Sequence, residues 1–238
     1  MSPIQCFARN TVGRDVAIGD IHGCFTKARA ALRAIRFNPA VDRLFSVGDL
    51  VDRGPENEEV LDWLREPWFH AVRGNHEEMA IEFARGRLPA EYYMRNGGGW
   101  NISNPAPARR EIADAFESLP IAIEVETSNG LVGIVHADCP LQRWQDVEAT
   151  LAGPNGEAFQ EAVQWSRDRF DRENRENVDG VRAVIVGHTP MQRCSSLGNT
   201  IYIDTGAWIA RENRQFTILD LSTLQPVHQP SVQLWDER

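Results

Sequence analysis

The sequence has few cysteines, and none of them forms a recognisable metal or disulfide motif. Cys6, Cys24, Cys139 and Cys194 are scattered along the 238 residues, and no two of them make a Cys-x-x-Cys pair. Neither a zinc ribbon nor a disulfide scaffold is therefore indicated. We interpret each cysteine as a small buried hydrophobe and not as a reactive thiol.

The sequence also lacks a long apolar run and an excess of basic residues. No apolar stretch approaches the length that spans a bilayer, and the start MSPIQCFARN has no apolar core of a secretion signal. A formal net charge of -9 argues against nonspecific binding to nucleic acid or to an anionic membrane, because both need a basic face. We expect a cytoplasmic protein with no nucleic-acid or membrane partner. The oligomeric state stays open.

Short apolar runs that end in glycine or histidine recur along the chain, and we interpret them as buried strands. Between the first two runs, Phe25, Ala28, Ala31, Leu32 and Ile35 recur at helical spacing, and ENEEVLDWLRE (56–66) predicts a second helix. Alternating strands and helices predict a right-handed parallel unit, with functional groups at the carboxyl ends of the strands. The runs are DVAIGD (15–20), RLFSVGD (43–49), FHAVRGN (69–75), GLVGIVHAD (130–138) and RAVIVGHTP (182–190).

The later strands follow one another with short connections, which predicts a mixed or antiparallel second sheet made of IAIEVE, GLVGIVH, NTIYIDT and QFTILDL. The expected fold class is α/β, with two packed mixed β-sheets flanked by helices. We expect a single domain over residues 1–238 with a surface excursion at about 83–118. Within it, the glycines and prolines of NGGGWNISNPAPARR (96–110) argue against a long regular element.

Polar side chains cluster where the expected strands end. Asp20 and His22 are two residues apart in an extended chain, so both can point to the same place. Carboxylate, imidazole and amide groups suit manganese, iron or zinc, and the absence of thiolates argues against a purely structural zinc site. Two ions that share Asp49 would use every candidate and leave positions open for water and substrate. The candidate ligands are Asp20, His22, Asp49, Asn75, His136 and His188.

Each cluster taken singly has a structural explanation. A histidine at a strand end is more often a hydrogen-bonded structural residue than a ligand, and Gly-Asp and Gly-Asn pairs often only make turns. Five such clusters are poorly explained as independent turns, because burying that much charge is costly unless a metal neutralises it. Together they favour a metal site.

In this order and spacing, the motifs GDIHG, GDLVDRGP, RGNHE, VHAD and VGHTP resemble the phosphoprotein phosphatase family of calcineurin-like metallophosphoesterases. The segments NGGGW, WSRDR and YIDTGA are similar to its bacterial and phage branch, of which phage lambda protein phosphatase is typical. The resemblance covers roughly Asp15 to Ala207 and implies a metallophosphoesterase sandwich. The sequence has HAD where eukaryotic members have a glycine-rich HGG, which puts eukaryotic regulatory subunits in doubt.

The resemblance implies a role for each motif residue. Asp20, His22 and Asp49 would hold one divalent ion, and Asp49, Asn75, His136 and His188 would hold the other, with manganese expected and iron or zinc as alternatives. His76 matches the catalytic histidine of the family and Asp52 the acid that pairs with it. Arg53 and Arg167 match the phosphate-binding arginines, with Arg169 as the lesser candidate for the second.

The implied function is a metal-dependent serine/threonine protein phosphatase that acts on phosphorylated proteins or peptides. Whether phosphotyrosine is also a substrate stays open. Hydroxide held by the two ions would attack phosphorus, and His76 would protonate the leaving group as a general acid. Cys24 and Cys139 are not needed as nucleophiles. A symmetrical diadenosine tetraphosphate hydrolase is the alternative, and a catalytically silent binding scaffold is a third reading. We also hypothesise that Gly97–Gly99 belong to a mobile lid, with a plain surface loop as the alternative.

Overall fold

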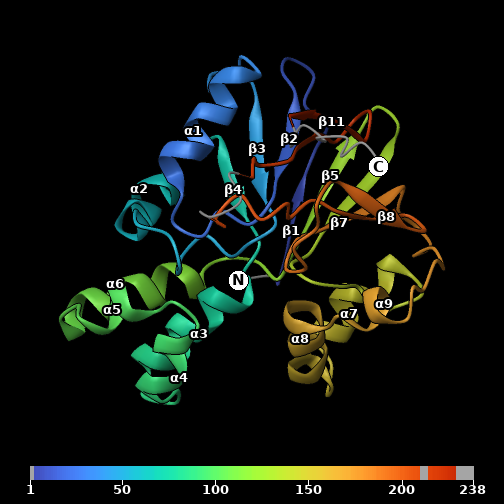
Figure 1. Cartoon of the computed structure of the whole chain (residues 1–238). Helices are drawn as coiled ribbons and strands as arrows, with labels where there is room; N and C mark the ends of the chain where they lie inside the picture. The colour runs from blue at the N-terminus through green and yellow to red at the C-terminus, as the bar shows by residue number, and fades with distance from the viewer. Residues whose placement is uncertain (1–2, 210–213, 229–238) are drawn as a thin grey trace, which may run out of the picture.

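The computed structural model describes residues 3–209 and 214–228. The parts of the expected domain at residues 1–2, 210–213 and 229–238 lie outside the described residues. Two sheets pack face to face, and helices cover the outside and one end of the pair (Figure 1). This arrangement confirms the predicted fold class. The first sheet has the order β11-β10-β2-β3-β4, with β2 at Asp15–Ile18, β3 at Arg43–Ser46, β4 at Phe69–Ala71, β10 at Ile218–Asp220 and β11 at Gln225–His228.

The second sheet has six strands in the order β1-β5-β6-β7-β9-β8 and is mixed. β6 pairs in parallel with β7, and β7 with β9, while β5 runs antiparallel to β6. The carboxyl ends of β6 and β7 therefore lie at the same edge. The strands are β1 at Ile4–Phe7, β5 at Ala122–Thr127, β6 at Gly130–Ile134, β7 at Ala183–Val186, β8 at Ser195–Leu197 and β9 at Thr200–Tyr202.

The side chains of β2 and β3 alternate between two cores, as the two-residue period of a strand requires. Ala17 and Phe45 point into the core between the sheets, whereas Val16, Ile18 and Leu44 pack against the helices on the outer face. Each of these side chains is fully buried. The first sheet is therefore buried on both faces, which explains why its parallel strands read as continuous apolar runs.

The helices form three groups (Figure 1). α1 (Phe25–Ala34) and α2 (Val60–Leu64) cover the outer face of the first sheet. Two further groups lie beyond one end of the sheets (Figure 1). The first comprises α3 at Asn75–Ala84, α4 at Ala90–Arg95, α5 at Gly99–Ile102 and α6 at Ala106–Glu117, and the second α7 at Val147–Leu151, α8 at Gly156–Trp165 and α9 at Asp168–Asp171.

The structure corrects four of the predictions. The segment QFTILDL contains β10, which joins the first sheet antiparallel to β2 and not the second sheet. ENEEVLDWLRE forms a 3₁₀ turn at Asn57–Glu59 and then only the five residues of α2. The segment 96–110 contains α5 and the start of α6, because Pro105 and Pro107 fall at the N-cap and the first turn, where no backbone N–H is needed. Cys6 is exposed.

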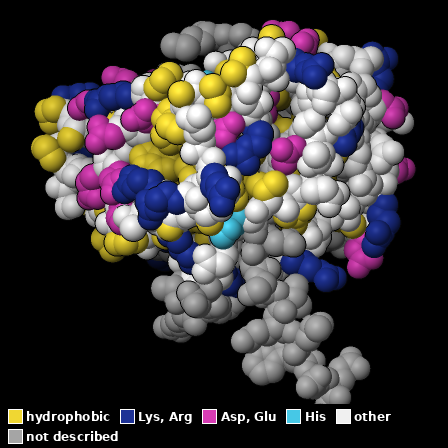
Figure 2. All heavy atoms as spheres, turned by 90° about the horizontal axis from the view of Figure 1, so that it is seen from above, with side chains coloured by type: hydrophobic (Ala, Val, Ile, Leu, Met, Phe, Trp, Pro, Cys, Tyr) yellow, Lys and Arg dark blue, Asp and Glu magenta, His cyan; other side chains and the backbone are white. Residues whose placement is uncertain are grey.

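The surface agrees with the acidic composition. On the face seen in Figure 2, basic and acidic side chains lie next to one another, and no broad basic area stands out. Elsewhere the described residues include ion pairs such as Arg29 with Glu59 at 2.6 Å. Among the described residues, no helix is long and apolar enough to cross a membrane.

Candidate metal centre and its surroundings

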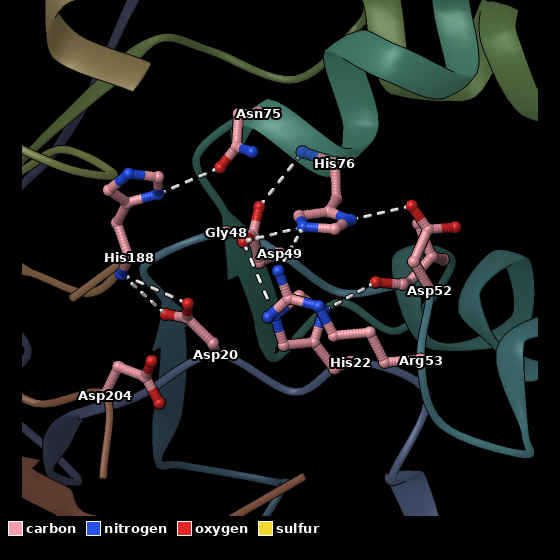
Figure 3. Close-up of polar contacts among 12 residues, drawn as sticks. Asp20, His22, Gly48, Asp49, Asp52, Arg53, Asn75, His76, His188 and Asp204 are labelled. Carbon is pink, nitrogen blue, oxygen red and sulfur yellow. Dashed lines mark hydrogen bonds and ion pairs between the residues drawn. The ribbon is translucent and has the colours of Figure 1, made fainter. Parts of the chain in front are cut away.

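The ends of five strands, three from the first sheet and two from the second, bring the candidate ligands together. Asp20 and His22 follow β2, Asp49 follows β3, and Asn75 is the first residue of α3, shortly after β4. His136 and His188 follow β6 and β7 of the other sheet. Figure 3 shows five of these side chains, those of Asp20, His22, Asp49, Asn75 and His188, converging on a common space from separate segments. The side chains of all six candidates are buried.

The backbone of this region is strained. Among the described residues, eight other than glycine have positive φ, and five of them belong to the site: His22 (44°), Asp49 (50°), Asp52 (71°), Arg53 (69°) and His188 (61°). Side chains other than glycine adopt this region at a cost of order 1–3 kcal/mol each, so such residues persist where the surroundings hold them. Their concentration at one place is typical of a functional site.

Asp49 lies at the centre of the cluster. Its Oδ1 is 3.3 Å from Nε2 of His136, and its Oδ2 is 3.5 Å from Nε2 of His22 and 3.8 Å from Nε2 of His76. Its two carboxylate oxygens thus face two different groups of ligand atoms. Burial opposes ionisation of Asp49, but the imidazoles of His136 and His76 hold its pKa well below the usual range. Asp49 is placed to bridge two cations, as a shared ligand would be.

The tautomers of two histidines follow from their backbone partners. Nδ1 of His22 lies 2.8 Å from the carbonyl of Val51, and Nδ1 of His136 lies 2.7 Å from the carbonyl of Val47. A carbonyl can only accept, so each Nδ1 carries a proton and each Nε2 is the nitrogen that faces the centre. This arrangement is the common one for imidazole that ligates a metal.

Acceptor atoms converge around Asn75. Its Oδ1 lies 2.8 Å from Nε2 of His136 and 3.0 Å from Nδ1 of His188, whose Nε2 is buried without a partner. Lone pairs brought this close repel one another unless a proton or a metal cation lies among them. Burial lowers the pKa of His188 to about 3, so this ring is neutral and able to ligate. The donor set therefore fits a divalent metal ion.

A further carboxylate, Asp204, was not identified from the sequence. It follows β9 beside Asp20 (Figure 3), is 1% exposed, and leaves its Oδ2 without a partner. Burial, Asp204 and Asp49 raise the pKa of Asp20 well above its usual range, although the backbone N–H of His188 donates to both oxygens of Asp20. So many buried carboxylates repel one another, and a bound cation would relieve that repulsion.

Glu77 holds the two ligand-bearing turns together. Its carboxylate accepts the backbone N–H groups of Asp49 at 2.9 Å, Leu50 at 2.8 Å and Gly74 at 2.8 Å. Burial raises its pKa to about 7, and Asp49 contributes to the rise. From the sequence alone, an acid at this position reads as a favourable charge at a helix N-terminus. The structure shows in addition that Glu77 ties the turn after β3 to the turn before α3.

His76 and Asp52 form a buried pair beside the cluster. Nδ1 of His76 lies 2.7 Å from Oδ2 of Asp52, and both side chains are at most 1% exposed. The guanidinium of Arg53 contacts Nε2 of His76 at 2.9 Å and Nε2 of His22 at 2.8 Å, and it stacks on Trp208 at 4.2 Å (Figure 3). Since arginine can only donate, both Nε2 atoms accept in this arrangement.

The two candidate arginines after α8 have different surroundings. Arg167 donates to the carbonyl of His188 at 3.2 Å, so it lies at the edge of the cluster. Arg169 is 7% exposed, and it donates to Asp138 at 3.0 Å and to the carbonyl of Glu176 at 2.7 Å. Arg169 therefore holds the loop after α9, and Arg167 is the one that faces the site.

Two triads of the described residues have ligand atoms within 4.8 Å of one another, namely His22, Asp49 and His76, and Asp49, His136 and His188. Both contain Asp49, so the cluster is divided as a dinuclear site would be. The first triad includes His76, which the family resemblance assigns to proton transfer and not to a metal. The two cysteines nearest to the site are poor nucleophiles, because burial raises the pKa of Cys24 and, to about 11, that of Cys139.

Comparison with known proteins agrees with this geometry. Residues 15–192 match the family model described as calcineurin-like phosphoesterase. The chain is 38% identical over 193 residues to serine/threonine-protein phosphatase 1 of Salmonella typhimurium, which covers 80% of this chain and 85% of the relative. It is 30% identical over 205 residues to a symmetrical bis(5'-nucleosyl)-tetraphosphatase of Coxiella burnetii, covering 81% of this chain and 66% of the relative.

The fold also has a counterpart among solved structures. A protein serine/threonine phosphatase of Saccharomyces cerevisiae superposes with a TM-score of 0.60 at 18% identity, covering 99% of this chain and 86% of that one. At this identity the likeness concerns the fold alone.

Proposed function

The chain belongs to the calcineurin-like phosphoesterase family, and we propose that it is a metal-dependent protein phosphatase. Its main substrates would be phosphoserine and phosphothreonine, with phosphotyrosine as a further substrate. The observation that carries the proposal is the placement of Asp49 between two groups of ligand atoms, next to the His76–Asp52 pair. The similarity to a serine/threonine-protein phosphatase over 85% of that protein's length supports the substrate class.

Six side chains would hold two divalent ions, with Asp49 shared between them. Asp20 and His22 complete one set, and Asn75, His136 and His188 complete the other. Asn75 contributes an oxygen without adding charge to a site already rich in carboxylates. Manganese is the expected metal, and iron or zinc suits the same donors. When bound, such ions acidify water and polarise the phosphoryl oxygens.

His76 would protonate the departing alkoxide, which is a poor leaving group when it comes from serine or threonine. Asp52 accepts from Nδ1 of His76, so it fixes the ring and leaves Nε2 as the atom that faces the leaving oxygen. As a general acid, His76 needs a proton on Nε2, but Nε2 accepts a hydrogen bond from Arg53 in the structure. The guanidinium of Arg53 would therefore have to move away from His76 before the reaction. Arg53 would thus move from ring nitrogens to phosphoryl oxygens.

The two arginines would bind the non-bridging phosphate oxygens. Arg53 stacks on Trp208, which keeps its planar group beside the cluster, and Arg167 lies at the other side, against His188. A guanidinium can hold two oxygens at once, so lysine cannot replace it without loss. Charge on these oxygens is redistributed in the transition state, and both arginines should therefore affect turnover as well as binding.

The second candidate function is symmetrical hydrolysis of diadenosine tetraphosphate. It is favoured by the similarity to the bis(5'-nucleosyl)-tetraphosphatase, although the identity is lower and a smaller share of that relative is covered. A silent scaffold is the least favoured, because all six candidate ligands are buried together and five residues of the site have positive φ.

A substrate panel tests the proposal. The manganese-loaded protein is assayed on phosphoserine, phosphothreonine and phosphotyrosine peptides and on diadenosine tetraphosphate, by phosphate release and by chromatography of the nucleotides. We expect higher kcat/KM on the phosphoserine and phosphothreonine peptides than on the dinucleotide. A clear preference for diadenosine tetraphosphate, with ADP as product, would replace the proposal with its alternative, and inactivity on all four would support a scaffold. We also propose a cytoplasmic location, where phosphoproteins are the expected partners.

A further inference from the structure

The excursion that carries α4 and α5 contacts the proton-transfer pair directly. We infer that Trp100 and Tyr93 are positioning residues for the general acid, acting on His76 through Asp52. The inference rests on the proposed function, because it concerns the same reaction. It also replaces the idea of a mobile lid with that of a fixed support.

Both oxygens of Asp52 are occupied, and on opposite sides. Oδ2 accepts from Nδ1 of His76 at 2.7 Å, and Oδ1 accepts from Nε1 of Trp100 at 2.7 Å and from the hydroxyl of Tyr93 at 3.3 Å. Asp52 has no exposed surface, so water cannot substitute for these donors. The orientation of the carboxylate toward His76 therefore depends on two side chains from the excursion.

Asp52 lies in an irregular, strained stretch of backbone, so its side-chain contacts contribute to holding the carboxylate in place. Its φ is 71°, and Arg53 follows with a φ of 69°. The indole and phenol donors occupy Oδ1, so Oδ2 is the oxygen that faces His76. Loss of Trp100 as a donor would leave Oδ1 with only the longer contact to Tyr93, and the carboxylate would be held less firmly toward His76.

Two of the three glycines of NGGGW, Gly97 and Gly98, allow a close approach to neighbouring groups. A Cβ on Gly97 would lie 2.6 Å from the backbone nitrogen of Arg53, and a Cβ on Gly98 would lie 2.2 Å from the ring of Tyr93. Gly97 has a φ of 100°, which glycine adopts readily. The segment is thus packed against the turn that contains Arg53, and α5 presents Trp100 to it.

The partners of Trp100 and Tyr93 hold them in place. Tyr93 is fully buried, and Nδ2 of Asn101 donates to its hydroxyl at 3.4 Å. Trp100 packs against the same apolar core as α3 and α6. Burial and Asp52 raise the pKa of Tyr93, so its hydroxyl stays protonated as a donor.

The test uses Trp100→Phe and Tyr93→Phe, which remove one donor each and keep an aromatic side chain. Trp68→Phe is the matched control, because it removes an indole donor to Glu66 at a half-buried position outside the site. Each variant is assayed on a phosphoserine peptide and on 4-nitrophenyl phosphate, whose leaving group needs less protonation. Thermal unfolding confirms that each variant is folded.

We expect Trp100→Phe to lower kcat on the peptide about 10-fold, a part of the roughly 100- to 10,000-fold that a general acid contributes, with KM nearly unchanged. The loss should be smaller on 4-nitrophenyl phosphate and absent when His76 is already asparagine. Tyr93→Phe should show the same pattern more weakly, because its contact is longer, and Trp68→Phe should match the wild type.

Three results would overturn the inference while leaving the proposed function intact. They are an equal loss on both substrates, a loss that persists in the His76→Asn background, and a raised KM with normal kcat, which would indicate a lid. If the folded wild type hydrolyses no phosphate ester, the proposed function itself fails, and the inference fails with it.

Discussion

Removal of the Glu77 carboxylate should destabilise the protein far more than removal of other acids in the same helix. In Glu77→Ala, the backbone N–H groups of Asp49, Leu50 and Gly74 lose their acceptor in a buried place. Each orphaned donor costs about 1–3 kcal/mol, and water that enters the vacated space offsets part of the sum. We therefore expect a loss of roughly 3–6 kcal/mol, a large part of the total stability of a domain.

The conservative variant Glu77→Gln should lower the free energy of unfolding by a smaller amount. Leu50 donates to Oε1, whereas Asp49 and Gly74 donate to Oε2. In Glu77→Gln, the amide oxygen can keep the Oε2 position, so that only the donor from Leu50 faces an NH₂ group. The expected cost is then about 1–3 kcal/mol, below that of the alanine variant.

Urea denaturation followed by tryptophan fluorescence measures these differences, with Glu82→Ala as the control. Glu82 lies in the same helix, and it pairs with Arg87 at the surface, a contact of about 0–1 kcal/mol. A Glu77→Ala variant as stable as Glu82→Ala, to within about 1 kcal/mol, would refute the assigned role of Glu77.

Three further predictions concern the proton donor, the arginines and pH. His76→Asn should lower turnover of a phosphoserine peptide about 100- to 10,000-fold at unchanged metal content, and an equal loss on aryl phosphates would contradict an acid role. Arg167→Ala should weaken inhibition by inorganic phosphate and leave the melting temperature unchanged. Arg169→Ala should lower the free energy of unfolding by about 3–5 kcal/mol, because Asp138 is left buried without its ion-pair partner. Calorimetry and phosphate titration distinguish the two variants, and the reverse pattern would assign the phosphate-binding role to Arg169. Burial lowers the pKa of His70 to about 4. As the pH falls from 6.5 toward 4, the unfolded chain takes up a proton at this residue before the folded protein does, so the free energy of unfolding decreases. The wild type should thus lose about 1–2 kcal/mol more than His70→Phe over that range in urea titrations, and parallel losses would contradict the assignment.

The sequence predicted the parallel unit and the strand ends well, because both rest on local patterns. Buried parallel strands read as continuous apolar runs, and Asp20, His22 and Asp49 follow them directly. The position of β10 could not be predicted, since its antiparallel pairing with β2 joins residues about 200 positions apart in the chain. β1 and β11 lie at the sheet edges and carry a weak alternation, with several exposed positions.

The residues that the motifs mark lie together in the structure, whereas residues that join them only through tertiary contacts were missed. Asp204 gains its importance only from burial beside Asp20, and a lone acid after a strand carries no such signal. The same holds for Trp100, whose indole reaches Asp52 across 48 positions of the chain. Exposure was also misjudged for Cys6, which lies on the edge strand β1 and donates to Glu124.

Titration of divalent metal into metal-free protein tests the central claim most directly. The protein is stripped with a chelator, and phosphate release from a phosphoserine peptide is followed as manganese is added back. The account predicts no turnover without metal and full recovery that saturates at two ions per chain, since the residues around Asp49 form two sets of ligands and the nearby cysteines are poor nucleophiles. Undiminished turnover by the metal-free protein, or saturation at a single ion, would contradict it.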